Sequence, residues 1–242
     1  MALSHRGRPL APDSIRLRFR GSAGQSFGAF AVEGMSLTLT GEANDSVAKG
    51  MSGGDIALRP PAPLAASGHR HVIAGNAILY GATGGRAFIA GRVGERFAVR
   101  NSGALAVVEG VGDHACEYMT AGVVVVLGEF GRNLGAGMSG GRAYVFDPEG
   151  LLPGRYNPEM VALERGLSAE SAEQLREMVE WHRDATGSAR AHELLARWEA
   201  SLPFFWKVIP KDTGRGQDAR PVPDSVPRLS VVASPGRAAS AS

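Results

Sequence analysis

Asp113, His114 and Glu117 lie within five residues of one another and could form a small metal-binding or acid–base cluster. Carboxylates and an imidazole are the side chains that such chemistry uses. All three belong to one predicted turn, and the sequence places no second set of ligands beside it. We therefore expect His114 to be a turn or interface residue, and we predict no metal-binding, catalytic or cofactor-binding residue in the chain.

Two other features could suggest chemistry. The segment from Gly110 to Gly112 resembles part of a dinucleotide-binding fingerprint, in which phosphate approaches a glycine turn and the N-terminus of a helix. No helix is predicted after it, so corner glycines of a repeat explain it better. Cys116 is the sole cysteine, which excludes an intrachain disulfide, a four-cysteine zinc site and an iron–sulfur cluster built from this chain alone. We expect it to be a small buried hydrophobic residue.

Arginine and asparagine recur at turns of neighbouring repeats, which predicts a polar ladder on one face. In one interpretation this ladder is a solvated edge, with asparagines bonded to the turn backbone. In the other it is a docking face, where arginines meet the carboxylates of a partner. Taken with the three titratable side chains, the candidate partner interface consists of Arg96, Arg100, Asn101, Asp113, His114, Glu117, Arg132 and Asn133.

The elements that carry these turns repeat along the chain. A glycine that opens a polar turn recurs at spacings of 19, 18 and 19 residues, namely Gly75, Gly94, Gly112 and Gly131. A second glycine precedes an apolar strand with nearly the same beat, at Gly85, Gly103, Gly122 and Gly141. Upstream glycines spaced 20 residues apart place 35–40 and 55–58 at the same strand position. Periods of this kind indicate stacked structural repeats.

Each repeat holds short strands of four to six residues separated by turns rich in glycine, asparagine and serine, without a helical period or a leucine-rich frame. An antiparallel sandwich would show hairpin turns at varied spacing. The repeat therefore predicts an all-β fold, a single-stranded right-handed parallel β-helix in which about six coils of 18–20 residues fit between Gly21 and Asp147. Residues 60–71 interrupt the beat and are predicted to be an insertion.

After Pro158 the pattern becomes helical. Ser168 or Ser171 is predicted to cap a helix that stops at Gly187, and a second helix begins near Ser188. An extended aromatic segment follows at 202–210, and we expect these elements to close one end of the solenoid. The predicted organisation is an N-terminal extension (1–14), a β-helix domain (15–156), a helical C-terminal cap (157–212) and a disordered tail (213–242).

Charge and hydropathy narrow the class of function. The 26 basic and 24 acidic residues form a mixed surface without a basic stripe, so nucleic acid is not expected as a partner. No stretch approaches the roughly 20 apolar residues of a membrane span, and the N-terminus lacks the apolar run of a signal peptide. We expect a cytoplasmic protein that does not bind membranes.

Several phrases are more specific than a generic β-helix. They are GSAGQSFGAF (21–30), GEANDSVAKGMSGG (41–54), GNAILYGATGG (75–85), AGRVGERFAVRNSGALAVVEGVGDHACEYMTAG (90–122), GRNLGAGMSGGRAYVFD (131–147), NPEMV (157–161), the tryptophan–histidine and threonine–glycine–serine pattern of 181–188, and VIPK (208–211). Together these phrases resemble the C-terminal GXGXG domain of the glutamate synthase large subunit, over residues 15–212.

The resemblance implies a division of labour. In that family an amidotransferase domain with an N-terminal cysteine hydrolyses glutamine. Ammonia passes through a tunnel to a domain with FMN and an iron–sulfur cluster, where 2-oxoglutarate becomes glutamate. The β-helix is the scaffold that abuts these domains and helps enclose the tunnel. This chain begins Met1-Ala2-Leu3, has one cysteine and shows no barrel pattern for FMN.

We therefore expect a non-catalytic structural subunit of a glutamate synthase-type oxidoreductase. Amidotransferase and FMN-domain subunits would be its partners, and they would carry the FMN and the iron–sulfur cluster. Two alternatives stay open. The chain could belong to a related split system such as N-methylglutamate synthase, or it could be a detached binding or regulatory β-helix module. Formylmethanofuran dehydrogenase uses a related β-helix, but its phrases agree less well.

Overall fold

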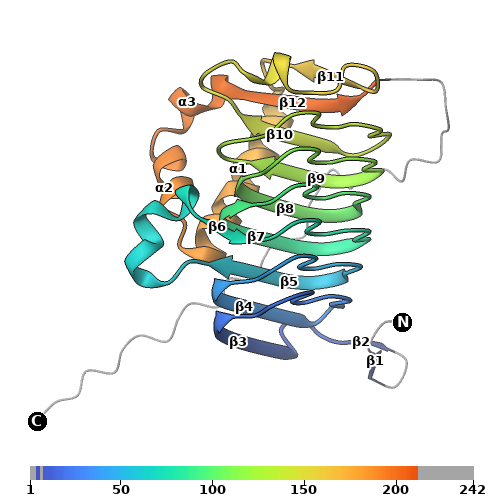
Figure 1. Ribbon diagram of the computed structural model, residues 1–242, viewed down its shortest axis with the longest axis vertical. Helices are drawn as coiled ribbons and strands as arrows, with labels where there is room; N and C mark the ends of the chain where they lie inside the picture. Colours follow the sequence, from blue (N-terminus) through green and yellow to red (C-terminus); the bar gives the residue numbers. More distant parts are fainter. Residues whose placement is uncertain (1–3, 6–7, 212–242) are drawn as a thin grey trace, which may run out of the picture.

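The computed structural model describes residues 4–5 and 8–211, and its core is a stack of seven parallel strands, one from each coil (Figure 1). In stacking order these strands are β3 (Ile15–Ser22), β4 (Met35–Glu42), β5 (Ser52–Arg59), β7 (Gly84–Val93), β8 (Ser102–Gly110), β9 (Ala121–Val126) and β10 (Arg142–Phe146). The predicted parallel β-helix is confirmed. The coil count rises from six to seven because the first strand begins before Gly21, where the sequence count started.

Apolar side chains of successive coils stack on one another inside the solenoid. One interior column runs through Leu39, Leu58, Ile89 and Val108, which are paired in register from strand to strand. All four are buried, as is the rest of this column toward β10. Parallel strands pair evenly only when equivalent residues share a face, so the 18–20-residue beat of the sequence sets the register.

The outer face of the central strands is also buried. Phe88, Val107 and Val125 lie on it, and they pack against the apolar stripe of α1 (Ala169–Thr186). Two buried faces explain why these strands are continuous apolar runs instead of alternating patterns.

The helices lie at the predicted residues of the chain, but they do not cover the end of the solenoid as predicted. Ser168 caps α1 by accepting a hydrogen bond from Ser171 N, and Gly187 ends it in the left-handed region at φ 71°. Helix α2 (Ala189–Ala196) begins after Ser188, and α3 (Trp198–Ser201) follows. Figure 1 shows these helices along the side of the strand stack, where α1 contacts β5, β7, β8 and β9. They do not close an end, because their apolar faces complement the outer strand face.

A strand pair closes the C-terminal end instead. The aromatic segment forms η3 (Leu202–Phe204) and β12 (Phe205–Pro210), and β12 pairs antiparallel with both β10 and β11 (Val161–Glu164). A short 3₁₀ turn, η2 (Leu152–Gly154), lies just before the predicted boundary at 156. Beneath this end, Leu152 and Val161 are fully buried.

The predicted insertion at 60–71 lies in the chain between β5 and β7, which still pair directly with each other. It forms η1 (Ala62–Arg70), which packs on β7 and α2, and leads into β6 (Val72–Ala74). A small separate pair, β1 (Ser4–His5) and β2 (Arg8–Pro9), precedes the first coil. Within the described part of the chain, no helix has the length and apolar character that crossing a membrane requires. The predicted disordered tail lies outside the described residues.

Candidate docking face

A run of alternating left-handed residues lies between each stacked strand and the next, from β3 to β10, and we call the stacked runs the turn ladder. In six successive coils the residues with positive φ occupy three alternate positions. They are Ser26, Gly28 and Phe30; Ser46, Ala48 and Gly50; Ala77, Leu79 and Gly81; Arg96, Ala98 and Arg100; His114, Cys116 and Tyr118; and Asn133, Gly135 and Gly137. A non-glycine residue in this region costs on the order of 1–3 kcal/mol, so the neighbouring coils must hold it there.

Backbone hydrogen bonds between coils supply that support. The amide groups of Arg96 and Arg100 donate to carbonyl oxygens of the following coil, at 2.9 and 2.8 Å. Between them, Ala98 N donates to Ile78 O of the preceding coil at 2.8 Å. The same alternation recurs at His114, where N donates to Arg132 O at 2.9 Å. Apart from Gly28, Asn133 and Gly137 in the first and last runs, each of these left-handed residues is therefore fixed by a backbone bond to a neighbouring coil.

Most of the predicted interface residues lie on this ladder and pair with one another across adjacent coils. Arg132 Nη2 lies 3.0 Å from Asp113 Oδ2, and the Arg132 backbone amide donates to Asp113 Oδ1 at 2.7 Å. These bonds, the backbone one first, hold the pKa of Asp113 below its ordinary value of 3.8. Arg96 Nε lies 3.6 Å from Glu117 Oε2.

His114 belongs to a second chain of contacts. Asn133 Nδ2 lies 3.0 Å from His114 Nδ1, and Asn157 Nδ2 donates to Asn133 Oδ1 at 2.8 Å. Asp113, His114 and Glu117 thus each meet a different partner, and the described residues contain no group of three His, Cys, Asp or Glu side chains placed to hold a metal ion. The interpretation of His114 as a turn residue agrees with this placement.

The guanidinium groups of the ladder reach solvent. The Arg132 side chain is 82% exposed and that of Arg96 is 60% exposed. Arg100 is exposed as well, and its guanidinium lies 5.9 Å from the ring centroid of Tyr118, itself 54% exposed. In the described part of the chain Arg100 makes no ion pair. The ladder thus presents three cations and an aromatic ring to solvent.

Asn101 is placed differently from the prediction, because it is fully buried. Its Oδ1 accepts from Ala104 N at 2.9 Å and Gly103 N at 3.2 Å, and its Nδ2 donates to Ala104 O at 3.0 Å. The strand register aligns Ala104 with the corner glycines Gly85 and Gly122 of neighbouring coils, so Gly103 lies one residue out of the predicted column. Asn101 thus braces the corner that lacks its glycine, and it is not on the docking face.

The first glycine column makes room for polar side chains of the coil before it. A Cβ atom at Gly94 would lie 2.2 Å from Asn76 Oδ1, and one at Gly131 would lie 2.2 Å from Asp113 Oδ1. Gly112 leads into the turn ladder and no helix follows it, in keeping with a corner glycine rather than a phosphate loop. Cys116 is fully buried, and this burial raises the pKa of its thiol to about 12.

A buried polar group that was not predicted from the sequence lies beneath the helices. Glu109 of β8 is 2% exposed, and its Oε1 lies 3.3 Å from Nε2 of the fully buried His182. The hydroxyl of Ser188, the N-cap of α2, donates to the same carboxylate and accepts from Ala191 N at 2.9 Å. The sequence signal that could have revealed this group is Glu109 itself, a charged residue at the end of the apolar run of β8. The contacts fasten α1 and α2 to the solenoid.

Comparison with known proteins identifies the protein family to which the chain belongs. The family model described as "GXGXG motif" matches residues 1–211. The chain is 53% identical to the ferredoxin-dependent glutamate synthase of Pyropia yezoensis over 86% of its own length and 14% of that protein. It is 51% identical to the NADH glutamate synthase of Schizosaccharomyces pombe over 84% of its length and 10% of that protein. The NADPH glutamate synthase large chain of Bacillus subtilis is 50% identical over 84% of this chain and 13% of the relative.

These matches cover most of the chain but at most about one-seventh of each relative. This chain belongs to the GXGXG family and corresponds to one segment of the glutamate synthases.

Proposed function

We propose that the chain is the non-catalytic scaffold of a glutamate synthase-type complex, which converts glutamine and 2-oxoglutarate into glutamate in the cytoplasm. The observation that carries the proposal is the identity of about half of the residues with glutamate synthases over more than four-fifths of the chain. The resemblance assigns glutamine hydrolysis to an amidotransferase partner and the reduction to a partner with FMN and an iron–sulfur cluster.

The packing and burial of the side chains support a structural role for the chain. The interior of the solenoid is filled by stacked apolar side chains, and the buried Glu109–His182–Ser188 group is closed to solvent. Cys116, the only thiol, is buried with a pKa of about 12 and is thus protonated at neutral pH. A stiff stack of coils whose polar turns face outward suits a wall that abuts other domains and helps enclose an ammonia tunnel.

The turn ladder is the surface that we propose for docking. Arg96 and Arg100 lie on left-handed backbone that is fixed by bonds to the following coil, and the Arg132 amide is held by Asp113, so the backbone positions of all three arginines are set before any partner arrives. Pre-organised guanidinium groups bind carboxylates with little further loss of entropy. The proposed contact is an acidic surface of the amidotransferase or FMN-domain partner.

The test is to purify the chain from its native host under gentle conditions and to identify by mass spectrometry the proteins that accompany it. We expect an amidotransferase and an FMN protein, together with glutamine-dependent reduction of 2-oxoglutarate by the assembly. Product analysis with methylamine present separates glutamate from N-methylglutamate synthesis. A colourless, inactive chain that purifies without partners would overturn the proposal.

A further inference from the structure

The two ends of the solenoid differ. At the C-terminal end, the β11–β12 pair covers the last coil, and the side chains beneath it are buried. At the other end, β3 is the last strand of the sheet and pairs with β4 alone among the described strands. Repeat proteins need a covered or polar terminal repeat to stay soluble, so an open apolar coil requires an occupant.

The interior columns show how open this end is. Leu17 of β3 is 40% exposed, whereas its in-register neighbours Leu37 and Ile56 are 7% and 0% exposed. Phe19 is 41% exposed, whereas Leu39, the next residue in its column, is 1% exposed. Side chains that form the core of every other coil therefore reach solvent in the first coil.

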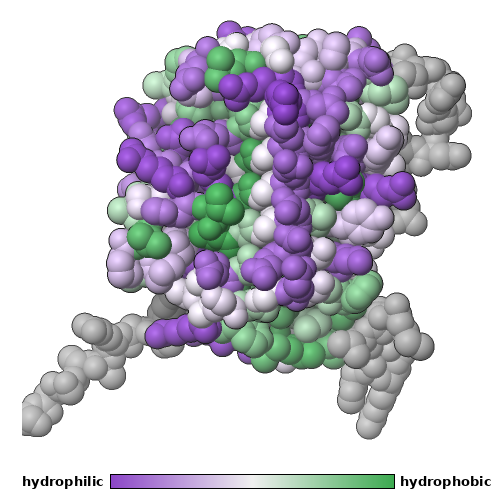
Figure 2. Space-filling view, viewed as in Figure 1, coloured by the Kyte–Doolittle hydropathy of each residue, from purple (hydrophilic) through white to green (hydrophobic). Residues whose placement is uncertain are grey.

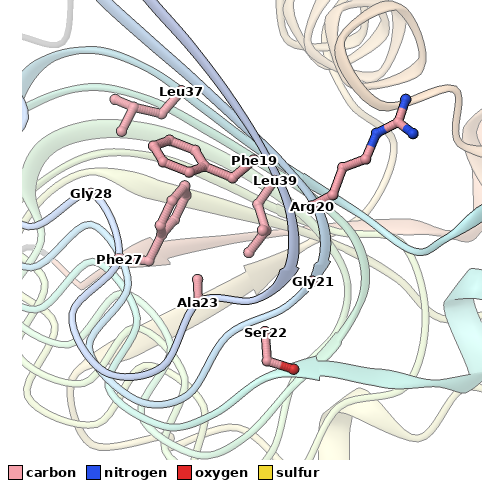
Figure 3. A pocket seen from close by; sticks show the side chains of 9 residues that line it. All are labelled: Phe19, Arg20, Gly21, Ser22, Ala23, Phe27, Gly28, Leu37 and Leu39. Atoms are coloured by element: carbon pink, nitrogen blue, oxygen red, sulfur yellow. The ribbon is translucent and has the colours of Figure 1, made fainter.

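A cavity of about 330 Å³ opens at this end, lined mainly by apolar side chains of the first two coils. Phe19, Phe27, Leu37 and Leu39 point toward one another around it, while Arg20 points away (Figure 3). Phe19 and Phe27 meet edge to face, with ring centroids 5.4 Å apart. Figure 2 shows hydrophobic residues gathered at the end of the molecule where β3 lies.

Charge on β3 indicates which occupant fits. Arg16, Arg18 and Arg20 alternate with the interior residues and are exposed. Arg16 pairs with Asp13 at 2.7 Å, whereas Arg18 and Arg20 have no ion-pair partner in the described part of the chain. The outward-facing backbone groups of an edge strand can pair with an added strand. Two copies of this chain joined through β3 would set arginine beside arginine, which is unfavourable.

We propose that the open first coil binds an extended segment of alternating apolar and acidic residues, which pairs with β3 as an eighth rung. Its apolar side chains fill the cavity beside Phe19 and Phe27, and its carboxylates face Arg18 and Arg20. We assign this segment to a part of the synthase outside this chain, and this assignment rests on the proposed function. The binding chemistry itself follows from the end of the solenoid alone.

The experiment titrates the full chain with two labelled peptides, one alternating valine with glutamate and one alternating valine with lysine. Fluorescence anisotropy gives the affinity, and amide hydrogen exchange locates the contact. We expect the acidic peptide to bind and to slow exchange of the β3 amides. Arg18→Glu should weaken that binding at least tenfold and favour the lysine peptide. The matched control Arg70→Glu, at an exposed arginine of η1, should change it less than twofold.

Three results would overturn the proposal: no slowing of β3 exchange, equal effects of Arg18→Glu and Arg70→Glu, or a β3-mediated dimer of the chain alone in light scattering. Assembly with the synthase partners is a separate readout. Loss of assembly in Arg18→Glu but not in Arg70→Glu would assign the segment to the synthase, and intact assembly in both would refute that source. A wild-type chain that binds the acidic peptide but assembles with no synthase partner would refute the proposed function and retain the eighth rung.

Discussion

At the scale of single residues, side chains that resembled a reactive cluster serve the stacking of coils. Asp113 bonds Arg132, and His114 contacts Asn133. The sequence placed these residues correctly on successive turns, because the glycine beat fixes which residues share a corner. The burial of Asn101 could not be predicted from the sequence, because it depends on Ala104 occupying a corner position that other coils fill with glycine.

The first prediction concerns the docking arginines. Replacing both Arg96 and Arg100 with alanine should weaken partner binding at least tenfold and leave the fold intact. The Arg96 side chain is 60% exposed and its contact with Glu117 is long at 3.6 Å, and surface pairs of this kind contribute about 0–1 kcal/mol. Binding is measured by surface plasmon resonance against the purified partners, and folding by thermal melting. Arg176→Ala, an exposed arginine of α1, is the control. Unchanged affinity in the double variant would remove the ladder as a docking face.

A second prediction tests the glycine column. Gly131→Ala should lower the free energy of unfolding by about 1–3 kcal/mol, since the new Cβ would lie 2.2 Å from Asp113 Oδ1 and 2.5 Å from Asp113 N. Gly154→Ala is the matched control, because a Cβ there meets nothing within 4 Å and its φ is not positive. Urea denaturation measures both. Equal stability of the two variants would contradict the packing assigned to this column.

A third prediction follows from the pKa of Asp113, which is lower in the folded chain than its ordinary value of 3.8. A lowered folded-state pKa stabilises the protein above the unfolded-state value, and this stability is lost as pH falls through the folded-state pKa. The difference in unfolding free energy between wild type and Asp113→Asn should thus stay constant from about pH 5 to pH 8 and shrink below about pH 4. A difference that grows on acidification would show the opposite shift.

At the scale of elements, local signals located the helices, whereas long-range packing decided where they lie. Ser168, Gly187 and Ser188 carry the cap and stop signals of α1 and α2, so these boundaries were predictable. That α1 lies along the side of the solenoid depends on the apolar outer faces of β7, β8 and β9. The sequence shows that those strands are apolar, but not which element covers them.

The anchor between the helices and β8 gives the fourth prediction. Ser188→Ala removes both the N-cap of α2 and a hydrogen bond to the buried Glu109, so it should cost about 2–4 kcal/mol. Ser168→Ala is matched to it, since that serine caps α1 with an exposed side chain and should cost about 1 kcal/mol. Chemical denaturation compares the two. Equal losses would mean that the Glu109 contact contributes nothing to holding the helices.

At the scale of the whole molecule, the periodic sequence predicted the solenoid because each coil repeats the same strand, corner and ladder. The ends could not be predicted in this way, since they are the places where the repeat stops. The C-terminal end is closed by β11 and β12, and the N-terminal end exposes Leu17 and Phe19. An end that remains open within this chain agrees with a segment that covers about one-seventh or less of its relatives.

The central claim is that the chain is a scaffold joining two active partners, and reconstitution tests it most directly. Purified amidotransferase and FMN-domain partners are assayed with and without the chain, using either glutamine or free ammonia as the nitrogen source. We predict that omitting the chain sharply lowers glutamine-dependent glutamate formation and changes ammonia-dependent formation much less, because the proposed role of the scaffold is to help enclose the route between the sites. Equal rates with and without the chain from both nitrogen sources would contradict the account.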